Sequence, residues 1–123
     1  MSEREWKVAR LQDISEPGAL EFRVGDGDWP FRGFLVRWNG QLHAYENVCP
    51  HAGHPLNFKP DGFFNLEESL LMCSSHGAVF APDNGECVAG PCAGNSLQML
   101  DCRVADGDVY VRAPGKQRAR QHA

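Results

Sequence analysis

The chain has 123 residues, a formal net charge of −4 and ordinary proportions of apolar, aromatic and charged residues. This length suits one domain, and the composition argues against disorder in most of the chain. All sixteen acidic residues and nine of the twelve Lys and Arg residues precede residue 113, so the body is acidic and unsuited to nucleic acid. No apolar run approaches the roughly 20 residues of a membrane span, and the N-terminus lacks the apolar region of a signal peptide. We therefore expect a soluble, cytoplasmic protein.

Strand patterns dominate the first 45 residues, in which apolar and polar side chains alternate or apolar side chains run together. The predicted strands cover residues 6–11, 20–24, 33–38 and 41–45. Asn39-Gly40 separates the last two, and Asn-Gly between strand patterns is the signature of a two-residue type I′ turn. The sequence therefore predicts an antiparallel hairpin here.

The character of the chain changes over residues 46–95, which are rich in Gly, Pro, Cys and His. The strand candidates in this stretch are short, at 70–73, 78–80 and 86–88, and one weak helix pattern covers Asn65–Leu71. The segment has too little apolar periodicity to fold by burial of apolar side chains alone. A bound metal centre would order it.

Strand patterns return at residues 97–104 and 109–112, with Asp106-Gly107 between them as a second hairpin turn. Residues 114–123 are basic and are expected to form a disordered tail. The layout is that of an all-β protein with an antiparallel framework and one loop-rich insertion.

Two short motifs in the insertion carry the chemistry. Cys49-Pro50-His51 is followed 21 residues later by Cys73-Ser74-Ser75-His76. Each motif supplies one thiol and one imidazole, and two such pairs suit either tetrahedral zinc or an iron–sulfur cluster. Buried structural cysteines and ordinary loop histidines are the alternative, but the paired spacing favours a metal site.

These motifs carry a family resemblance. C-P-H-A-G-H-P-L and C-S-S-H-G-A resemble the Rieske motif, and F-A-P-D-N-G followed by Gly90-Pro91 resembles the strand, turn and proline loop of that family. The likeness covers most of residues 30–112, although the spacer is lengthened by residues 59–69.

The resemblance implies a Rieske-type antiparallel β sandwich over residues 1–113, with a loop-rich cluster-binding subdomain at about 46–95. It also implies one 2Fe–2S cluster, with Cys49 and Cys73 on one iron and His51 and His76 on the other.

Two departures from the respiratory-chain members refine this expectation. Their extra cysteine pair is replaced here by His54 and Ser75, and their hydroxyl donors after the second motif are replaced by Ala78 and Phe80. Fewer hydrogen bonds to the cluster and thiolate sulfurs destabilise the reduced state. The resemblance therefore points to the low-potential, soluble ferredoxin type.

The function implied is that of an electron carrier rather than an enzyme, similar to the ferredoxin that links a flavin reductase to a terminal oxygenase. The small Rieske subunit of an NADH-dependent nitrite reductase is the alternative, and a structural zinc domain is a third reading that metal analysis separates. Partners are expected at the cluster tip around His51, His76 and Pro91, where Pro55 and Leu56 offer an apolar centre.

The remaining cysteines and histidines are interpreted as structural or surface residues rather than ligands. Cys87, Cys92 and Cys102 fall outside both motifs and are predicted to be buried structural thiols. Among the other histidines, His43 is predicted to be structural and His54 to be an exposed loop residue. An oxygenase would also need a mononuclear iron site, for which the chain retains too few ligands.

Overall fold

The computed structural model describes residues 3–25, 31–48, 56, 63–64, 70–73, 78–90 and 95–114. In that part of the chain, strands form almost all of the regular structure, with one short 3₁₀ turn, η1 (Leu11–Asp13). The strands are β1 (Glu3–Arg10), β2 (Gly18–Val24), β3 (Phe31–Trp38), β4 (Gln41–Glu46), β5 (Leu71–Met72), β6 (Val79–Phe80), β7 (Cys87–Ala89), β8 (Met99–Leu100), β9 (Cys102–Ala105) and β10 (Asp108–Pro114). The antiparallel all-β fold expected from the sequence is therefore confirmed.

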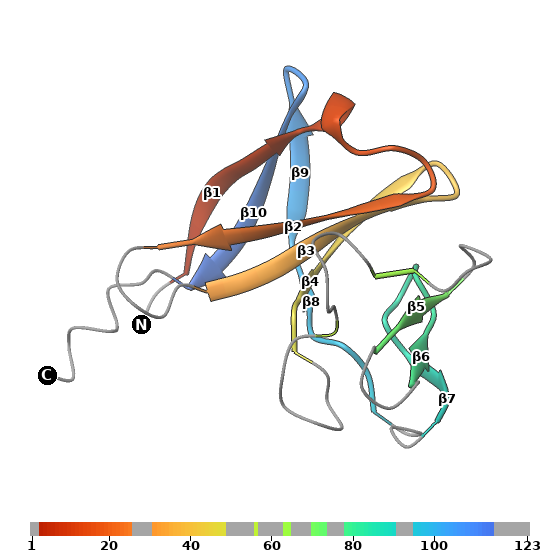
Figure 1. The fold of residues 1–123 in the computed structure, drawn as a ribbon. Coiled ribbons are helices and arrows are strands. Elements are labelled where there is room, and N and C mark those ends of the chain that lie inside the picture. Colours follow the sequence, from red (N-terminus) through yellow and green to blue (C-terminus); the bar gives the residue numbers. More distant parts are fainter. Residues whose placement is uncertain are drawn as a thin grey trace, which may run out of the picture.

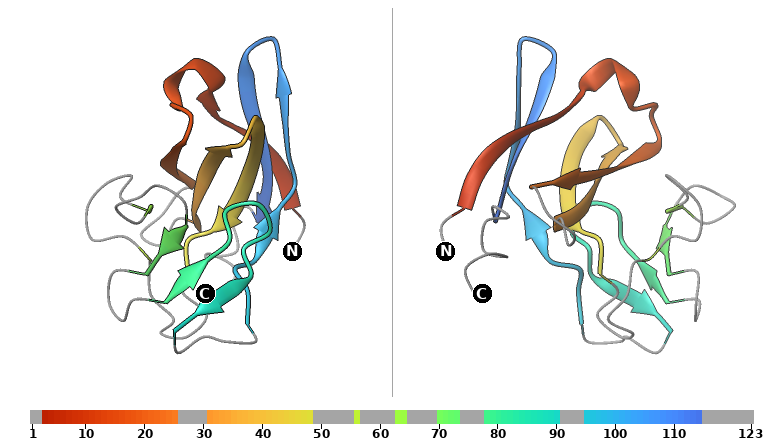
Figure 2. Two further views of the ribbon diagram at one scale, coloured as in Figure 1. Left: turned by 90° about the vertical axis from the view of Figure 1, so that its right-hand side faces the viewer. Right: turned by 60° about the vertical axis from the view of Figure 1, so that its left-hand side comes forward.

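These strands make three antiparallel sheets, ordered β1-β10-β9, β2-β3-β4-β8 and β5-β6-β7. The first two sheets pack together as the larger body, and the small third sheet lies against one side of the second, away from the paired ends of β1 and β10 (Figure 1). The two further views show the same separation (Figure 2). We call the two larger sheets the β framework and the β5-β6-β7 sheet with its loops the metal-binding module.

Both predicted hairpin turns are present. Asn39 and Gly40 have φ of 55° and 76°, and Asp106 and Gly107 have φ of 54° and 80°. Two successive residues in the left-handed region define a type I′ turn, which the Asn-Gly and Asp-Gly pairs adopt at low cost.

The single strand expected at 97–104 is two strands instead. Leu100 pairs with Ala44 in the second sheet, whereas Cys102 pairs with Val111 in the first. The chain changes sheets at Asp101, whose carbonyl accepts the Arg112 N–H at 2.9 Å. Alternation of side chains continues through such a crossing, so the sequence pattern could not reveal it.

Strand β3 has an interior on both faces, which explains its dense apolar run. Leu35 belongs to a core between the two framework sheets, and its neighbours Phe34 and Val36 belong to a second core shared with the metal-binding module. The buried residues of this second core, here called the module core, are Phe34, Val36, Tyr45, Leu56, Phe63, Leu71, Cys73, Ala78, Phe80, Cys87 and Leu97.

Some expectations fall outside the described residues. Of the weak helix at Asn65–Leu71, residues 65–69 are not described and Leu71 lies in β5. Residues 115–123 of the expected tail are not described either, and β10 includes Pro114. Within the described ranges, no helix is long and apolar enough to cross a membrane.

Candidate metal centre

The second motif begins at the end of β5. Leu71 pairs with Phe80 and Met72 with Val79, and the Cys73 N–H donates to the Ala78 carbonyl at 2.8 Å. The segment 74–77, which contains His76, therefore starts and ends at one tight antiparallel pair. Cys73 is fully buried in the module core and retains its thiol.

The first motif lies between two anchored positions. Residues 49–55, which contain Cys49 and His51, are not described, but β4 leads into them through Asn47 and Val48. Leu56 follows them and is fully buried in the same core as Cys73. The structure therefore brings the end of the first motif and the start of the second onto one core.

The burial of Leu56 corrects one expectation. Leu56 has no exposed surface, so it cannot form the apolar centre of a docking tip. Its contacts are with the module core, and its side chain supports the first motif from within. The sequence around Leu56 is compatible with both a surface docking role and a role in the core.

A third segment approaches the second motif from β7. Gly90 ends this segment with φ of 98°, and a Cβ added there would lie 2.8 Å from the Ala78 Cα. Glycine is therefore required both by the backbone angle and by the close approach. The expected proline loop begins beside the second motif, although Pro91 itself is not described.

Tyr45 ties the framework to the module. Its hydroxyl donates to the Pro82 carbonyl at 2.7 Å, and its side chain is fully buried between Phe34 and the module. Burial, assisted by the negative charge of Asp83, raises the pKa of Tyr45 well above its ordinary value, so the phenol stays a neutral donor. Sequence patterns do not single out this role, because Tyr45 fits the strand alternation like any core residue.

The leftover cysteines differ from one another. Cys87 is bonded in a disulfide, so the expectation of a structural thiol is wrong there. Disulfide connectivity cannot be deduced from sequence, and a cysteine that is predicted to be buried can still form a disulfide. Cys102 is a free thiol but is only half-buried rather than buried, and burial and nearby Asp101 raise its pKa. Cys92 lies outside the described residues.

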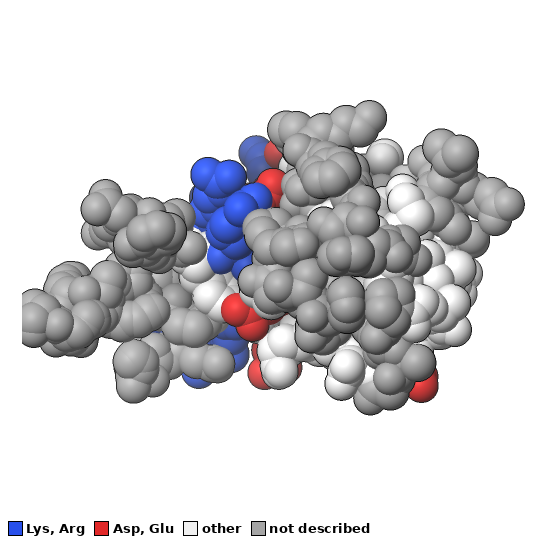
Figure 3. All heavy atoms as spheres, turned by 60° about the horizontal axis from the view of Figure 1, so that its bottom comes forward, with Lys and Arg blue, Asp and Glu red and all other residues white. Residues whose placement is uncertain are grey.

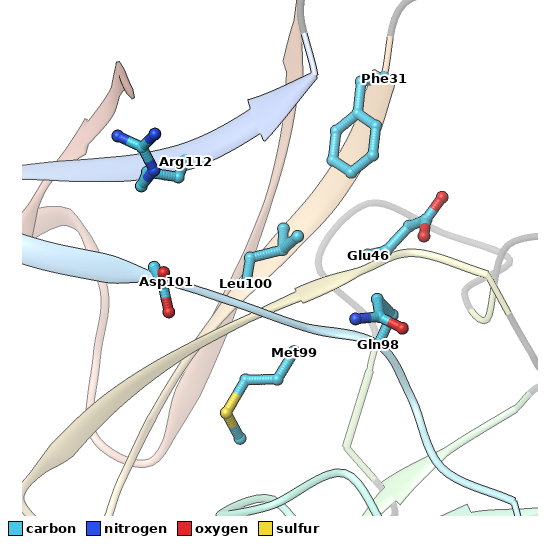
Figure 4. A pocket seen from close by; sticks show the side chains of 7 residues that line it. All are labelled: Phe31, Glu46, Gln98, Met99, Leu100, Asp101 and Arg112. Carbon is cyan, nitrogen blue, oxygen red and sulfur yellow. The ribbon is translucent and has the colours of Figure 1, made fainter. Parts of the chain in front are cut away.

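A pocket of about 400 Å³ lies in the framework and is lined by residues of β3, β4, β8 and β10 and of the segment around β8. In Figure 4, Phe31 at the start of β3 and Glu46 at the end of β4 both lie to the right of Leu100, which is on β8. The remaining residues that line it are Gln98, Met99, Asp101 and Arg112. Burial raises the pKa of Glu46, which favours its neutral form relative to an exposed glutamate.

Cys73 is the one predicted ligand that the structure describes, and its surroundings suit iron coordination. Cys73 offers a thiol from a fully apolar core, where an unliganded thiolate would be costly and iron coordination would stabilise it. Ala78 and Phe80, both fully buried beside it, contribute no side-chain donors. The other three predicted ligands, Cys49, His51 and His76, lie outside the described residues.

Two protein comparisons cover most of the chain. A human protein, apoptosis-inducing factor 3, is 31% identical over 106 residues, which is 86% of this chain but 16% of that protein. The ferredoxin component of the alkene monooxygenase system of Xanthobacter autotrophicus is 27% identical over 106 residues, which is 85% of this chain and 77% of that protein.

Solved structures share the fold. One chain of a complex of reduced oxygenase and oxidized ferredoxin in carbazole 1,9a-dioxygenase superposes with a TM-score of 0.69 at 24% identity, covering 91% of this chain and 95% of the other. The terminal oxygenase of carbazole 1,9a-dioxygenase from Novosphingobium sp. KA1 gives a TM-score of 0.74 at 20% identity over 94% of this chain, which spans 31% of that oxygenase chain.

The family assignment rests on a separate match. The family model of the Rieske [2Fe-2S] domain matches residues 5–110, a range that includes all three sheets up to Tyr110 in β10. The cofactor of this family is one 2Fe–2S cluster, in agreement with the donor chemistry of the module. From the match across nearly the whole framework and module, the chain belongs to the Rieske [2Fe-2S] domain family.

Proposed function

We propose that this chain is the ferredoxin component of an oxygenase system, taking single electrons from a flavin reductase and delivering them to a terminal oxygenase. The observation that carries the proposal is the match to the ferredoxin component from Xanthobacter autotrophicus, of which the chain covers 77%. A chain of similar extent stands in complex with an oxygenase in the carbazole system. Electron transfer through one 2Fe–2S cluster is the role that this family membership supports.

The proposed ligands are Cys49 and Cys73 on one iron and His51 and His76 on the other. When bound, the cluster supplies one-electron chemistry, and histidine in place of two thiolates leaves the oxidised centre neutral and easier to reduce. Because Cys73 is buried, we propose that its end of the cluster lies against the module core. The two histidines are then proposed to lie at the outer end, where a partner can approach closely.

The described surface around the module is suited to brief docking. On the face shown in Figure 3, described atoms toward the module are mostly uncharged, and Lys and Arg gather toward the opposite side. Val88 of β7, in the module, is an exposed apolar residue with 52% of its surface accessible. Electron-transfer encounters have small interfaces, and charges mainly steer the approach of the partners.

The test is electron transfer from a flavin reductase to a terminal oxygenase of an oxygenase system, with this chain as the carrier. We expect Val88→Asp to slow transfer to the oxygenase by about tenfold while the cluster spectrum stays unchanged. Val104→Asp is the matched control, because Val104 is 44% exposed but lies on β9 in the framework. Transfer that remains at the parent rate in Val88→Asp would show that partners use another face.

A subunit of a multi-subunit reductase, such as the nitrite reductase alternative, would carry the same cluster but remain bound to a larger enzyme. Copurification separates the two cases. A ferredoxin is expected to leave its partners on gel filtration at moderate salt, since its complexes are transient. Stable elution with a reductase subunit would favour the alternative.

A further inference from the structure

Asn47 is the one polar side chain that the core encloses within the described ranges, with 1% of its surface accessible. It follows the end of β4 and stands two residues before Cys49. Burial of an amide is costly unless its donors and acceptors find partners. The contacts of Asn47 therefore indicate what its burial achieves.

The side-chain carbonyl of Asn47 joins the two ends of the first motif. Its Oδ1 accepts the Leu56 N–H at 2.9 Å, and this hydrogen bond is buried. The segment between the two residues carries Cys49 and His51. Because Leu56 is itself packed in the module core, the hydrogen bond joins the residue after β4 to a buried position.

The β framework determines which way the amide points. Its Nδ2 donates to Glu21 Oε2 at 3.4 Å, and a carboxylate can only accept, so Oδ1 is left facing Leu56. Glu21 on β2 accepts in turn from Arg32 Nε at 3.0 Å and forms an ion pair with that guanidinium. The Arg32 carbonyl also accepts the Asn47 backbone N–H at 3.0 Å.

These contacts form one continuous connection from the second sheet to the first motif. Arg32 orients Glu21, Glu21 orients the Asn47 amide, and the amide holds Leu56. Replacing outer residues that orient metal ligands typically lowers metal affinity by roughly 10- to 100-fold.

We infer that Asn47 is a positioning residue for the cluster, which fixes the loop that carries Cys49 and His51 through its hydrogen bond to Leu56. The inference rests on the proposed ligands but not on the identity of any redox partner. It adds a residue that neither motif contains.

The first test compares Asn47→Ala with the parent. We expect iron release to an excess of chelator about tenfold faster, together with a shifted reduction potential and an altered EPR spectrum of the reduced cluster. Asn84→Ala is the matched control, because Asn84 Oδ1 also accepts a backbone N–H, that of Glu86, at 2.9 Å but in an exposed turn. The control should behave as the parent does.

A charge-preserving exchange separates positioning from general loss of stability. In the double variant Asn47→Asp with Glu21→Gln, the new carboxylate can accept both from Leu56 and from the new amide, and one carboxylate remains near Arg32. We expect this double variant to recover most of the iron retention and the parental EPR spectrum. Glu21→Gln alone is expected to give no gain over the parent in either measurement.

The outcomes are distinct. Parental iron retention, potential and spectrum in Asn47→Ala would overturn the inference, and so would a double variant as labile as Asn47→Ala. A parent chain that binds no 2Fe–2S cluster would instead refute the ligand proposal. Failure of the chain to exchange electrons with an oxygenase would refute only the proposed function, because iron retention is measured without any partner.

Discussion

The β framework and the metal-binding module are built by different means. In the framework, β2 and β3 pair over seven residues, and β1 and β10 pair over a similar length. In the module, β5 and β6 pair over only two residues, and β6 and β7 pair with a shift in register. Two- and three-residue strands supply too few contacts for independent stability.

The module is held instead by its contacts with other parts of the molecule. Apolar packing joins it to β3 and β4, and single hydrogen bonds such as Tyr45 to Pro82 join it at defined points. The cluster is expected to supply the remaining constraint, since metal binding contributes directly to folding free energy. The framework should therefore tolerate loss of iron, whereas the module should not.

The largest effect is expected from Cys73→Ala. Removal of this proposed ligand should abolish the cluster and raise amide exchange over residues 70–90, while the framework strands keep their protection. Iron and labile sulfide analysis with peptide-level hydrogen exchange would measure both parts. Cys102→Ser is the control, since Cys102 is a half-buried thiol on β9 and should retain the cluster. Loss of protection in the framework strands as well would contradict the claim that only the module depends on the cluster.

Neighbouring residues on β3 offer the next comparison. Phe34 stacks on Phe63 with ring centroids 4.1 Å apart in the module core, whereas Leu35 faces the core between the framework sheets. We expect Phe34→Ala to cost about 3–5 kcal/mol and Leu35→Ala about 2–5 kcal/mol. Denaturant unfolding measures these costs, and chelator assays should show faster iron loss mainly for Phe34→Ala. Equal iron loss in both variants would mean that the two cores act as one.

Tyr45→Phe should have a smaller effect, about 1–3 kcal/mol, because it leaves the Pro82 carbonyl without its donor. The folded protein raises the pKa of Tyr45 above the ordinary 10.0, mainly by burial. The unfolded chain thus loses the phenol proton first, so this contribution is complete below about pH 10 and declines at higher pH. Unfolding curves from pH 8 to 11 should show a shallower alkaline decline in the variant. If stability declined equally with pH in the parent and the variant, a group other than Tyr45 would be responsible for the decline.

The smallest effect concerns the potential itself. With Ala78 and Phe80 beside the second motif, we expect a parent value near the low end of the Rieske range, roughly −150 mV. Ala78→Ser should raise it by on the order of 40 mV, the equivalent of about 1 kcal/mol for one electron, if the hydroxyl reaches a sulfur. Potentiometric titration measures both values. A parent potential well above zero would contradict this account of the donors.

Sequence reasoning succeeded where local chemistry determines structure. The Asn39-Gly40 and Asp106-Gly107 turns follow from the conformational freedom of those residues, and the strands beside them follow from side-chain alternation. The close approach of Gly90 to Ala78 likewise agrees with the expected turn and loop. The two turns and the strands beside them depend on residues close together in the chain.

Sequence reasoning failed where distant contacts decide. The change of sheets at Asp101 depends on which partner strands are nearby, and the disulfide of Cys87 depends on a second cysteine that spacing does not identify. Asn47 was indistinguishable from an ordinary turn residue, because its role depends on Glu21 and Leu56. Leu56 resembled a surface loop residue until its burial was known.

The most direct test of the account is pulsed EPR of the reduced protein, prepared with ¹⁵N-labelled histidine. The account predicts one 2Fe–2S cluster with strong couplings to two histidine nitrogens, and the loss of the cluster when His51 or His76 is replaced by Ala. A cluster without directly bound histidine nitrogen, or a protein that holds zinc and no labile sulfide, would contradict it.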